Sequence, residues 1–101
     1  MNIENLTQTV KERFDYESAK QVLKEKYEAK MLFALSGGMW CANPELITLL
    51  TAFSTDDIVI CDTYGNPCQV NRTELLHSAK ERYQEQMNAW VNEYDEVSRQ
   101  R

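Results

Sequence analysis

Apolar residues recur along one side of the segment from Arg72 to Ser98, and this segment limits most strongly what the chain can fold into. From Tyr83 onward they follow at steps of four, three, four and three residues, which is the spacing of a coiled-coil seam. We name these residues the seam: Tyr83, Met87, Trp90, Tyr94 and Val97. The pattern predicts an amphipathic helix about 40 Å long at 1.5 Å per residue.

The length of that helix matters because the chain has only 101 residues. A chain of this size forms one domain, residues 1–101, with a modest core. Hydrophobic residues make up 43% and charged residues 27%, as in folded globular proteins. A helix of about 40 Å is longer than so small a domain is expected to cover. The seam is therefore expected to need a partner surface.

A first helix is predicted upstream, from about Asp15 to Lys30. Its apolar residues recur at three- and four-residue steps. They are Ala19, Val22, Leu23 and Tyr27. The preceding residues 7–14 are either an earlier part of this helix or a separate short one. Val10 and Phe14 lie one helical step apart, which favours helical structure.

A β-hairpin is predicted at residues 31–42. Two apolar runs flank Ser36-Gly37-Gly38, and glycine reaches the positive φ values that tight hairpin turns require. The alternative is that the first helix continues through Leu35 and ends at Gly37, since glycine is a common helix C-terminal signal.

A short helix after Asn43 is predicted next. Asn43 is a good N-cap, and Pro44 suits the first helical position because its missing N–H is not needed there. The apolar residues of this helix occupy most of its sides, which predicts that it is buried in the core. They are Leu46, Ile47, Leu49, Leu50 and Phe53.

A second β-hairpin is predicted before the last helix. The β-branched run at residues 57–62 is the strongest strand, residues 63–67 form a turn, and residues 68–70 return. Asn71 then caps the last helix, with Glu74 three residues later. Together the elements predict an α+β fold: an N-terminal helix, two β-hairpins separated by a short buried helix, and a long C-terminal amphipathic helix.

The basic residues are confined to the two flanks. The eleven Lys and Arg residues lie in residues 1–31 and 72–101, where twelve acidic residues match them. Residues 32–71 contain no Lys or Arg. Nucleic-acid binding needs clustered, uncompensated basic residues, so nucleic acid is not the expected partner. No apolar run reaches the roughly 20 residues of a membrane span, and the first residues do not resemble a signal peptide. We therefore expect no membrane association and a cytoplasmic location.

No residue pattern predicts catalysis, a cofactor or a metal. Structural zinc uses four ligands, commonly with a close Cys-x-x-Cys pair, whereas Cys61 and Cys68 are seven residues apart and His77 is the only histidine. A catalytic thiol beside His77 would need a lowered pKa. Gly37-Gly38 lacks the further glycines and the lysine of a phosphate-binding loop, and the aspartates around residues 57–62 more simply begin and end a strand. We assign no catalytic, cofactor-binding or metal-ligating residue.

Three segments resemble small uncharacterised proteins of T4-like marine phages. They are Gly37-Gly38-Met39-Trp40, Asn43-Pro44-Glu45-Leu46-Ile47, and Tyr64-Gly65-Asn66-Pro67 with Val70-Asn71-Arg72-Thr73-Glu74-Leu75-Leu76. The similarity runs from Met31 to Tyr94, about two-thirds of the chain. It implies a phage or phage-like source, a place in the host cytoplasm, and an assembly or regulatory role. Such proteins carry no assigned catalytic residues, so the resemblance adds no site residue.

The sequence is best interpreted as a non-enzymatic protein-interaction or assembly module that self-associates through the seam. Met87, Trp90 and Tyr94 would be its anchors, because large aromatic residues and methionine are enriched at such contacts. The seam can be covered by the first helix, packed antiparallel against it. It can instead be covered by the last helix of a second subunit, which would give a symmetric dimer. The expected partner is a second copy or another protein. The alternatives are a nucleic-acid-associated regulator, which would touch phosphate through Arg99-Gln100-Arg101, and a cysteine-dependent enzyme.

Overall fold

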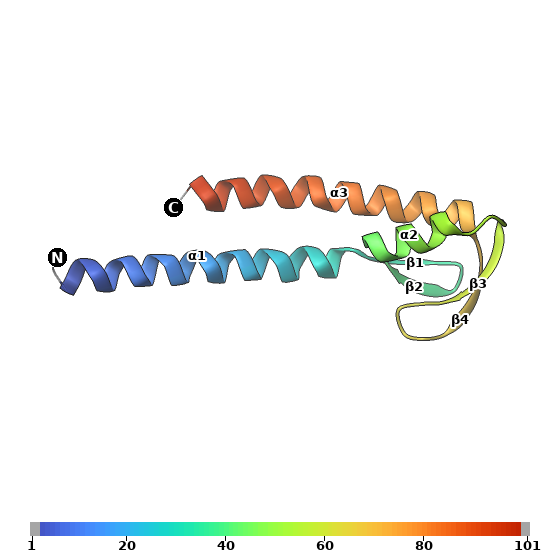
Figure 1. Cartoon of the computed structure of the whole chain (residues 1–101), viewed down its shortest axis with the longest axis horizontal. Helices are drawn as coiled ribbons and strands as arrows, with labels where there is room; N and C mark the ends of the chain where they lie inside the picture. The colour runs from blue at the N-terminus through green and yellow to red at the C-terminus, as the bar shows by residue number, and fades with distance from the viewer. Residues whose placement is uncertain (1–2, 100–101) are drawn as a thin grey trace.

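The computed structural model describes residues 3–99 of the chain, with side chains from residue 10 onward. Two long helices lie side by side and antiparallel, and two β-hairpins with a short helix between them lie at one end of the pair (Figure 1). The elements in chain order are α1 (Ile3–Lys30), β1 (Leu32–Leu35), β2 (Gly38–Cys41), α2 (Pro44–Ala52), β3 (Asp57–Cys61), β4 (Pro67–Asn71) and α3 (Arg72–Arg99). This arrangement confirms the predicted α+β fold.

The molecule has an elongated shape that we divide into an arm and a head. The arm is α1 together with residues 86–99 of α3, and the head is residues 31–85. The chain measures 66 × 24 × 20 Å and has a radius of gyration of 19.3 Å, whereas a compact domain of about 100 residues has about 13 Å. The arm projects from the head over most of the molecule's length (Figure 1).

Helix α1 is continuous from Ile3, so residues 7–14 belong to the same helix as the residues that follow them. No glycine or proline occurs before residue 37, and these are the two residues that most destabilise a helix interior. The helix ends at Lys30 because the next residue already belongs to the hairpin: the carbonyl oxygen of Met31 accepts a hydrogen bond from the N–H of Ala42 at 2.9 Å.

The first hairpin pairs β1 with β2 and places Leu35 opposite Gly38. Ser36 and Gly37 have φ angles of 52° and 79°, as a two-residue type I′ turn requires. The predicted hairpin at residues 31–42 is therefore confirmed, and the alternative of a helix ending at Gly37 is wrong. Gly38 is needed for a different reason, since a Cβ there would lie 3.0 Å from the ring of Trp40.

The second hairpin pairs β3 with β4 and is attached to the edge of the first. Asp62 begins its turn, and the Oδ2 atom of Asp62 accepts a hydrogen bond from the N–H of Met39 in β2 at 3.1 Å. The N–H of Thr63 donates to the carbonyl oxygen of Met39 at 2.8 Å. The outer edge of β2 is therefore covered by the second hairpin at this position.

The head is built around Trp40, whose side chain is 1% exposed and whose Nε1–H donates to the carbonyl oxygen of Leu35 at 2.9 Å. Buried residues from every element of the head pack in the same cluster. They are Met31, Phe33, Trp40, Ala42, Leu50, Ile58, Val70, Leu75 and Ala79. Because Leu75 and Ala79 belong to α3, the first half of that helix is part of the head's core.

Both predicted helix caps are confirmed. The Oδ1 atom of Asn43 accepts from the N–H of Leu46 at 2.9 Å, and the Oδ1 atom of Asn71 accepts from the N–H of Glu74 at 2.9 Å. These bonds satisfy N–H groups that have no partner inside a helix. Two asparagines thus fix where α2 and α3 begin.

Helix α2 differs from the prediction because it is not buried on all sides. Only Leu50 is buried, while Leu49 is 45% and Phe53 is 36% exposed. The helix packs along one side of α3, and a head this small has no further layer to cover its outer side. The apolar composition of α2 therefore exceeds what the chain itself buries.

Candidate interaction surface

The seam on α3 begins with residues that the chain buries in part. Tyr83 and Met87 are half-buried and pack against the core of the head. Trp90 is also half-buried, and its ring stacks on Tyr27 of α1 with ring centroids 5.9 Å apart and planes 8° apart. Helix α1 therefore covers the middle of the seam, which is the antiparallel packing that the sequence allowed.

The far end of the seam is less well covered. Val97 is half-buried, and Tyr94 remains 38% exposed. Val91, which neighbours the seam, is 49% exposed. The five seam residues lie along one side of α3 but have different surroundings. Tyr83 and Met87 contact the head, Trp90 contacts α1, and Tyr94 is partly exposed to solvent. Their role in an interface between two subunits remains a prediction.

A polar cluster at the middle of the arm joins α1 to α3. Lys26 Nζ lies 2.7 Å from Oε1 of Glu93, and the hydroxyl of Tyr27 donates to the same oxygen. These hydrogen bonds lower the pKa of Glu93 and raise the pKa values of Lys26 and Tyr27. The ammonium of Lys30 lies 5.3 Å from the centroid of the Tyr27 ring, a favourable cation–π distance. The cluster fixes the register of the two helices.

Sequence patterns predicted only one member of this cluster, Tyr27, from its place in the apolar stripe of the first helix. Lys26 and Glu93 are 67 positions apart, and each is one of many charged residues on a helix surface. Neither carries a local signal that would single it out. Their pairing follows from the antiparallel register.

The beginning of α1 extends past the described end of α3 (Figure 1). Near the described end of α3, the hydroxyls of Tyr16 and Ser98 form a hydrogen bond at 3.4 Å. Thirteen residues of α1 precede Tyr16, which corresponds to about 20 Å of helix. Within that stretch Val10 is 61% exposed, and Phe14 is 69% exposed. Two large apolar side chains are thus exposed on a part of α1 that α3 does not cover within the described residues.

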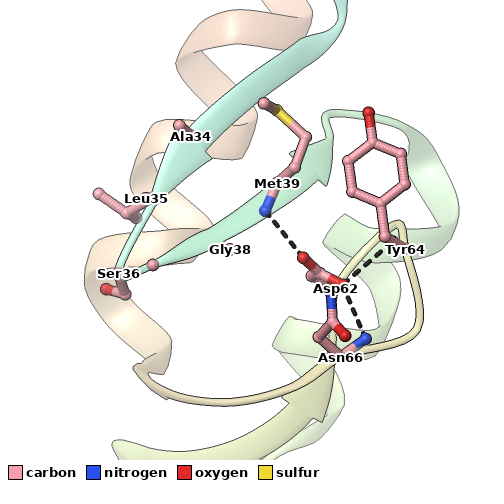
Figure 2. A pocket seen from close by; sticks show the side chains of 9 residues that line it. Ala34, Leu35, Ser36, Gly38, Met39, Asp62, Tyr64 and Asn66 are labelled. Carbon is pink, nitrogen blue, oxygen red and sulfur yellow. Dashed lines mark hydrogen bonds between the residues drawn. The ribbon is translucent and has the colours of Figure 1, made fainter.

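An open hollow of about 690 Å³ lies between the turns of the two hairpins (Figure 2). Asp62 is its one ionisable carboxylate, and its oxygens accept from the N–H groups of Met39, Tyr64 and Asn66 at 3.1, 3.0 and 2.9 Å. These bonds to backbone N–H groups lower the pKa of Asp62. The carboxylate therefore holds the two turns together, and three of its four lone pairs accept hydrogen bonds from backbone N–H groups.

The three thiols and the histidine lie on four different elements of the head: β2, β3, β4 and α3. Cys61 and Cys68 lie on opposite faces of the second hairpin, because Cys61 pairs with Pro67 and Cys68 with Ile60. Burial raises the pKa of the Cys41 thiol, which disfavours the reactive thiolate. His77 is on the surface, 3.5 Å from Glu81. Among the described residues no group of three or more His, Cys, Asp or Glu side chains could hold a metal ion.

The charge of the chain is concentrated in the head. Residues 31–85 contain seven acidic and three basic residues, a net charge of −4 out of the chain's −5. One of the three bases, Arg72, is used internally: its Nε–H donates to the carbonyl oxygen of Thr55 at 3.0 Å, and Nη1 lies 3.3 Å from that of Leu50. The arm has nine acidic and seven basic residues, a net charge of −2, so its charges nearly balance.

Comparisons of the chain with protein-family models, with curated proteins and with solved structures return no match. The resemblance to phage proteins therefore remains a prediction. Within residues 3–99, no helix is both long and apolar enough to cross a membrane.

Proposed function

We propose that the protein is a non-enzymatic interaction module that self-associates through its arm into a symmetric dimer. The observation that carries this proposal is an excess of surface. The chain exposes 7304 Å², whereas a compact monomer of the same mass exposes about 5,900 Å². The excess, about 1,400 Å², is larger than the roughly 800 Å² that each partner contributes to a standard protein interface.

The apolar residues of the arm support this reading of the excess. Five large hydrophobic side chains of the arm are more than a third exposed: Val10, Phe14, Val22, Val91 and Tyr94. Two antiparallel helices cover only one side of each other, and helix pairs of this kind are commonly completed as four-helix bundles. A second copy would supply the missing pair of helices.

The register of the arm favours an antiparallel second copy with the two heads at opposite ends. Tyr27 lies opposite Trp90 and Tyr16 opposite Ser98, so Tyr94, midway between Trp90 and Ser98, is level with residue 21 or 22 of α1. Residue 22 is eight residues from the end of α1, and residue 11 is eight from its start. When two arms overlap over their whole length, Val10 of one copy therefore lies within one helical turn of the level of Tyr94 of the other. In a symmetric dimer the twofold axis makes this contact between Val10 and Tyr94 occur twice, once from each copy.

This dimer also gives the uncovered start of α1 a partner. The exposed Val10 and Phe14 would lie against α3 of the second copy, beside the end of the seam. Tyr94 and Val97 would then act at the interface, as the sequence predicts, while Trp90 would act mainly within each chain. The nucleic-acid and cysteine-enzyme alternatives gain no comparable support, because acids accompany the helix bases and burial raises the pKa of the Cys41 thiol.

Sedimentation equilibrium of the purified chain tests the proposal. We expect twice the chain mass at micromolar concentration, with dissociation on dilution. A single species of the chain mass up to about 100 µM would refute self-association, because burial of an excess of about 1,400 Å² with several apolar anchors should give at least micromolar affinity.

A further inference from the structure

The outer edge of β1 carries backbone N–H and C=O groups that have no hydrogen-bond partner among the described residues. In a hairpin closed by a two-residue turn, Leu35 and Gly38 exchange hydrogen bonds, and the next pair, Ala34 and Met39, points its N–H and C=O groups outward. Met39 confirms this alternation, since its outward groups bond to Asp62 and Thr63. On the opposite edge the corresponding groups of Ala34 have no hydrogen bond within residues 3–99.

A groove runs along this unpaired edge. It has a volume of about 290 Å³, and residues 33–35 of β1 line one side of it and α3 the other. The residues that α3 contributes are Ser78, Glu81, Arg82 and Glu85. The edge has no proline and no charged residue of its own, although these are the usual devices that prevent strand addition. The groove therefore leaves the edge open to an extended chain.

The charge around the groove indicates what kind of chain would fit. Glu81 and Glu85 lie one helical turn apart on the α3 wall and are both exposed, against a single half-buried base, Arg82. The head as a whole carries a net charge of −4. Complementary charge steers and orients a partner at such a surface.

We propose that the groove binds an extended, basic segment of a partner protein, which adds to β1 as a third strand. The backbone of the segment would exchange hydrogen bonds with Ala34, and every second side chain would point to the side of Phe33 and Leu35, where α3 lies. A lysine or arginine at those positions reaches Glu81 and Glu85. Backbone bonds supply affinity and the two carboxylates supply the preference for basic side chains. This site lies on the head and does not depend on the arm.

Titration with defined peptides, followed by NMR of the ¹⁵N-labelled chain, tests the proposal. The probe is an acetylated and amidated seven-residue peptide that alternates valine and lysine. We expect saturable shifts of the Ala34 amide signal and its neighbours. The matched peptide that alternates valine and glutamate should bind at least tenfold more weakly. A valine–lysine peptide N-methylated at every second residue, on the edge that would face β1, should not shift the Ala34 signal.

Two outcomes would overturn the proposal. The first is equal binding of the N-methylated and unmethylated lysine peptides, which would mean that charge alone attracts them. The second is the absence of any shift at Ala34 at millimolar peptide.

A pair of variants separates the groove from the overall charge of the head. Glu81→Gln with Glu85→Gln should weaken the lysine peptide about tenfold. Glu45→Gln with Asp57→Asn removes the same charge from the head outside the groove and should change affinity less than threefold. Equal weakening by both pairs would refute a specific role for the α3 wall.

Discussion

The replacement of Val10 by threonine tests the proposed dimer at a residue that makes no contribution to the core of the monomer. Val10 is 61% exposed and lies before Tyr16, which forms a hydrogen bond with Ser98 of α3. Threonine has the same shape and a similar helix propensity. Val10→Thr therefore exchanges one methyl group for a hydroxyl and should leave the folded monomer unchanged.

The expected effect follows from the burial of that methyl group in the dimer. Loss of a buried methyl group costs about 0.8 kcal/mol, and the hydroxyl adds a desolvation cost of about 1 kcal/mol if it finds no partner. A symmetric dimer contains the change twice. The total is about 2–4 kcal/mol, which weakens the dimer roughly 30- to 700-fold at 1.4 kcal/mol per factor of ten.

Val59→Thr is the matched control. Val59 is 66% exposed, nearly the same as Val10, but it lies on the outer face of β3 in the head. Sedimentation velocity over a dilution series gives the dissociation constant of each variant, and circular dichroism confirms that both fold. Dissociation constants within threefold of each other for the two variants would refute the proposed contact, even if the chain does form a dimer.

Three further predictions test the arrangement of the chain. A spin label on Cys61, with the other two cysteines replaced by serine, should give a distance of roughly 60 Å between copies, because the overlapped arm alone is about 42 Å long; a distance shorter than the arm would indicate parallel pairing. Arg72→Met should lower the free energy of unfolding in urea by about 2–3 kcal/mol, because the substitution removes the hydrogen bonds from the charged guanidinium to two carbonyl oxygens. Lys80→Met, on the surface, is the control and should change the free energy of unfolding by less than about 0.5 kcal/mol. The pKa of Asp62 is lowered in the folded state from 3.8, so its contribution to stability is fully present above about pH 5 and is lost as the pH falls through the folded value; Asp62→Asn should therefore reduce the fall in melting temperature between pH 5 and pH 3, and an unchanged pH profile would contradict this role.

Local chemistry was sufficient to predict most of the fold. Asn43 and Asn71 were predicted as caps because an asparagine side chain can accept from an N–H that the helix cannot satisfy, and this requires no knowledge of the rest of the chain. The glycine at Gly37 favoured a hairpin turn, since a type I′ turn demands positive φ, but the same residue also suits a helix end, and the structure decides between the two. Signals of this kind predict the order of the elements, while the extent of the first helix and the choice between hairpin and helix end at residues 31–42 needed the structure.

Composition alone could not predict how the elements pack. Helix α2 is apolar on most sides, yet Leu49 and Phe53 are exposed, because burial depends on whether a second layer exists to cover them. The contact of Lys26 with Glu93 depends on the antiparallel register of two distant helices. The link from Asp62 to Met39 depends on where one hairpin docks on the other. These contacts join residues that are far apart in sequence and carry no periodic signal.

The start of α1 connects the stability of a helix with the proposed dimer. Residues 3–15 are helical and precede the hydrogen bond between Tyr16 and Ser98, and a helical stretch of about 13 residues depends on tertiary packing for most of its stability in water. A second copy that packs against the exposed Val10 and Phe14 would add tertiary contacts to this stretch. Ordering of the stretch and dimer formation would then be one coupled event. In this proposal, the apolar residues near the start of α1 pack against α3 of the second copy.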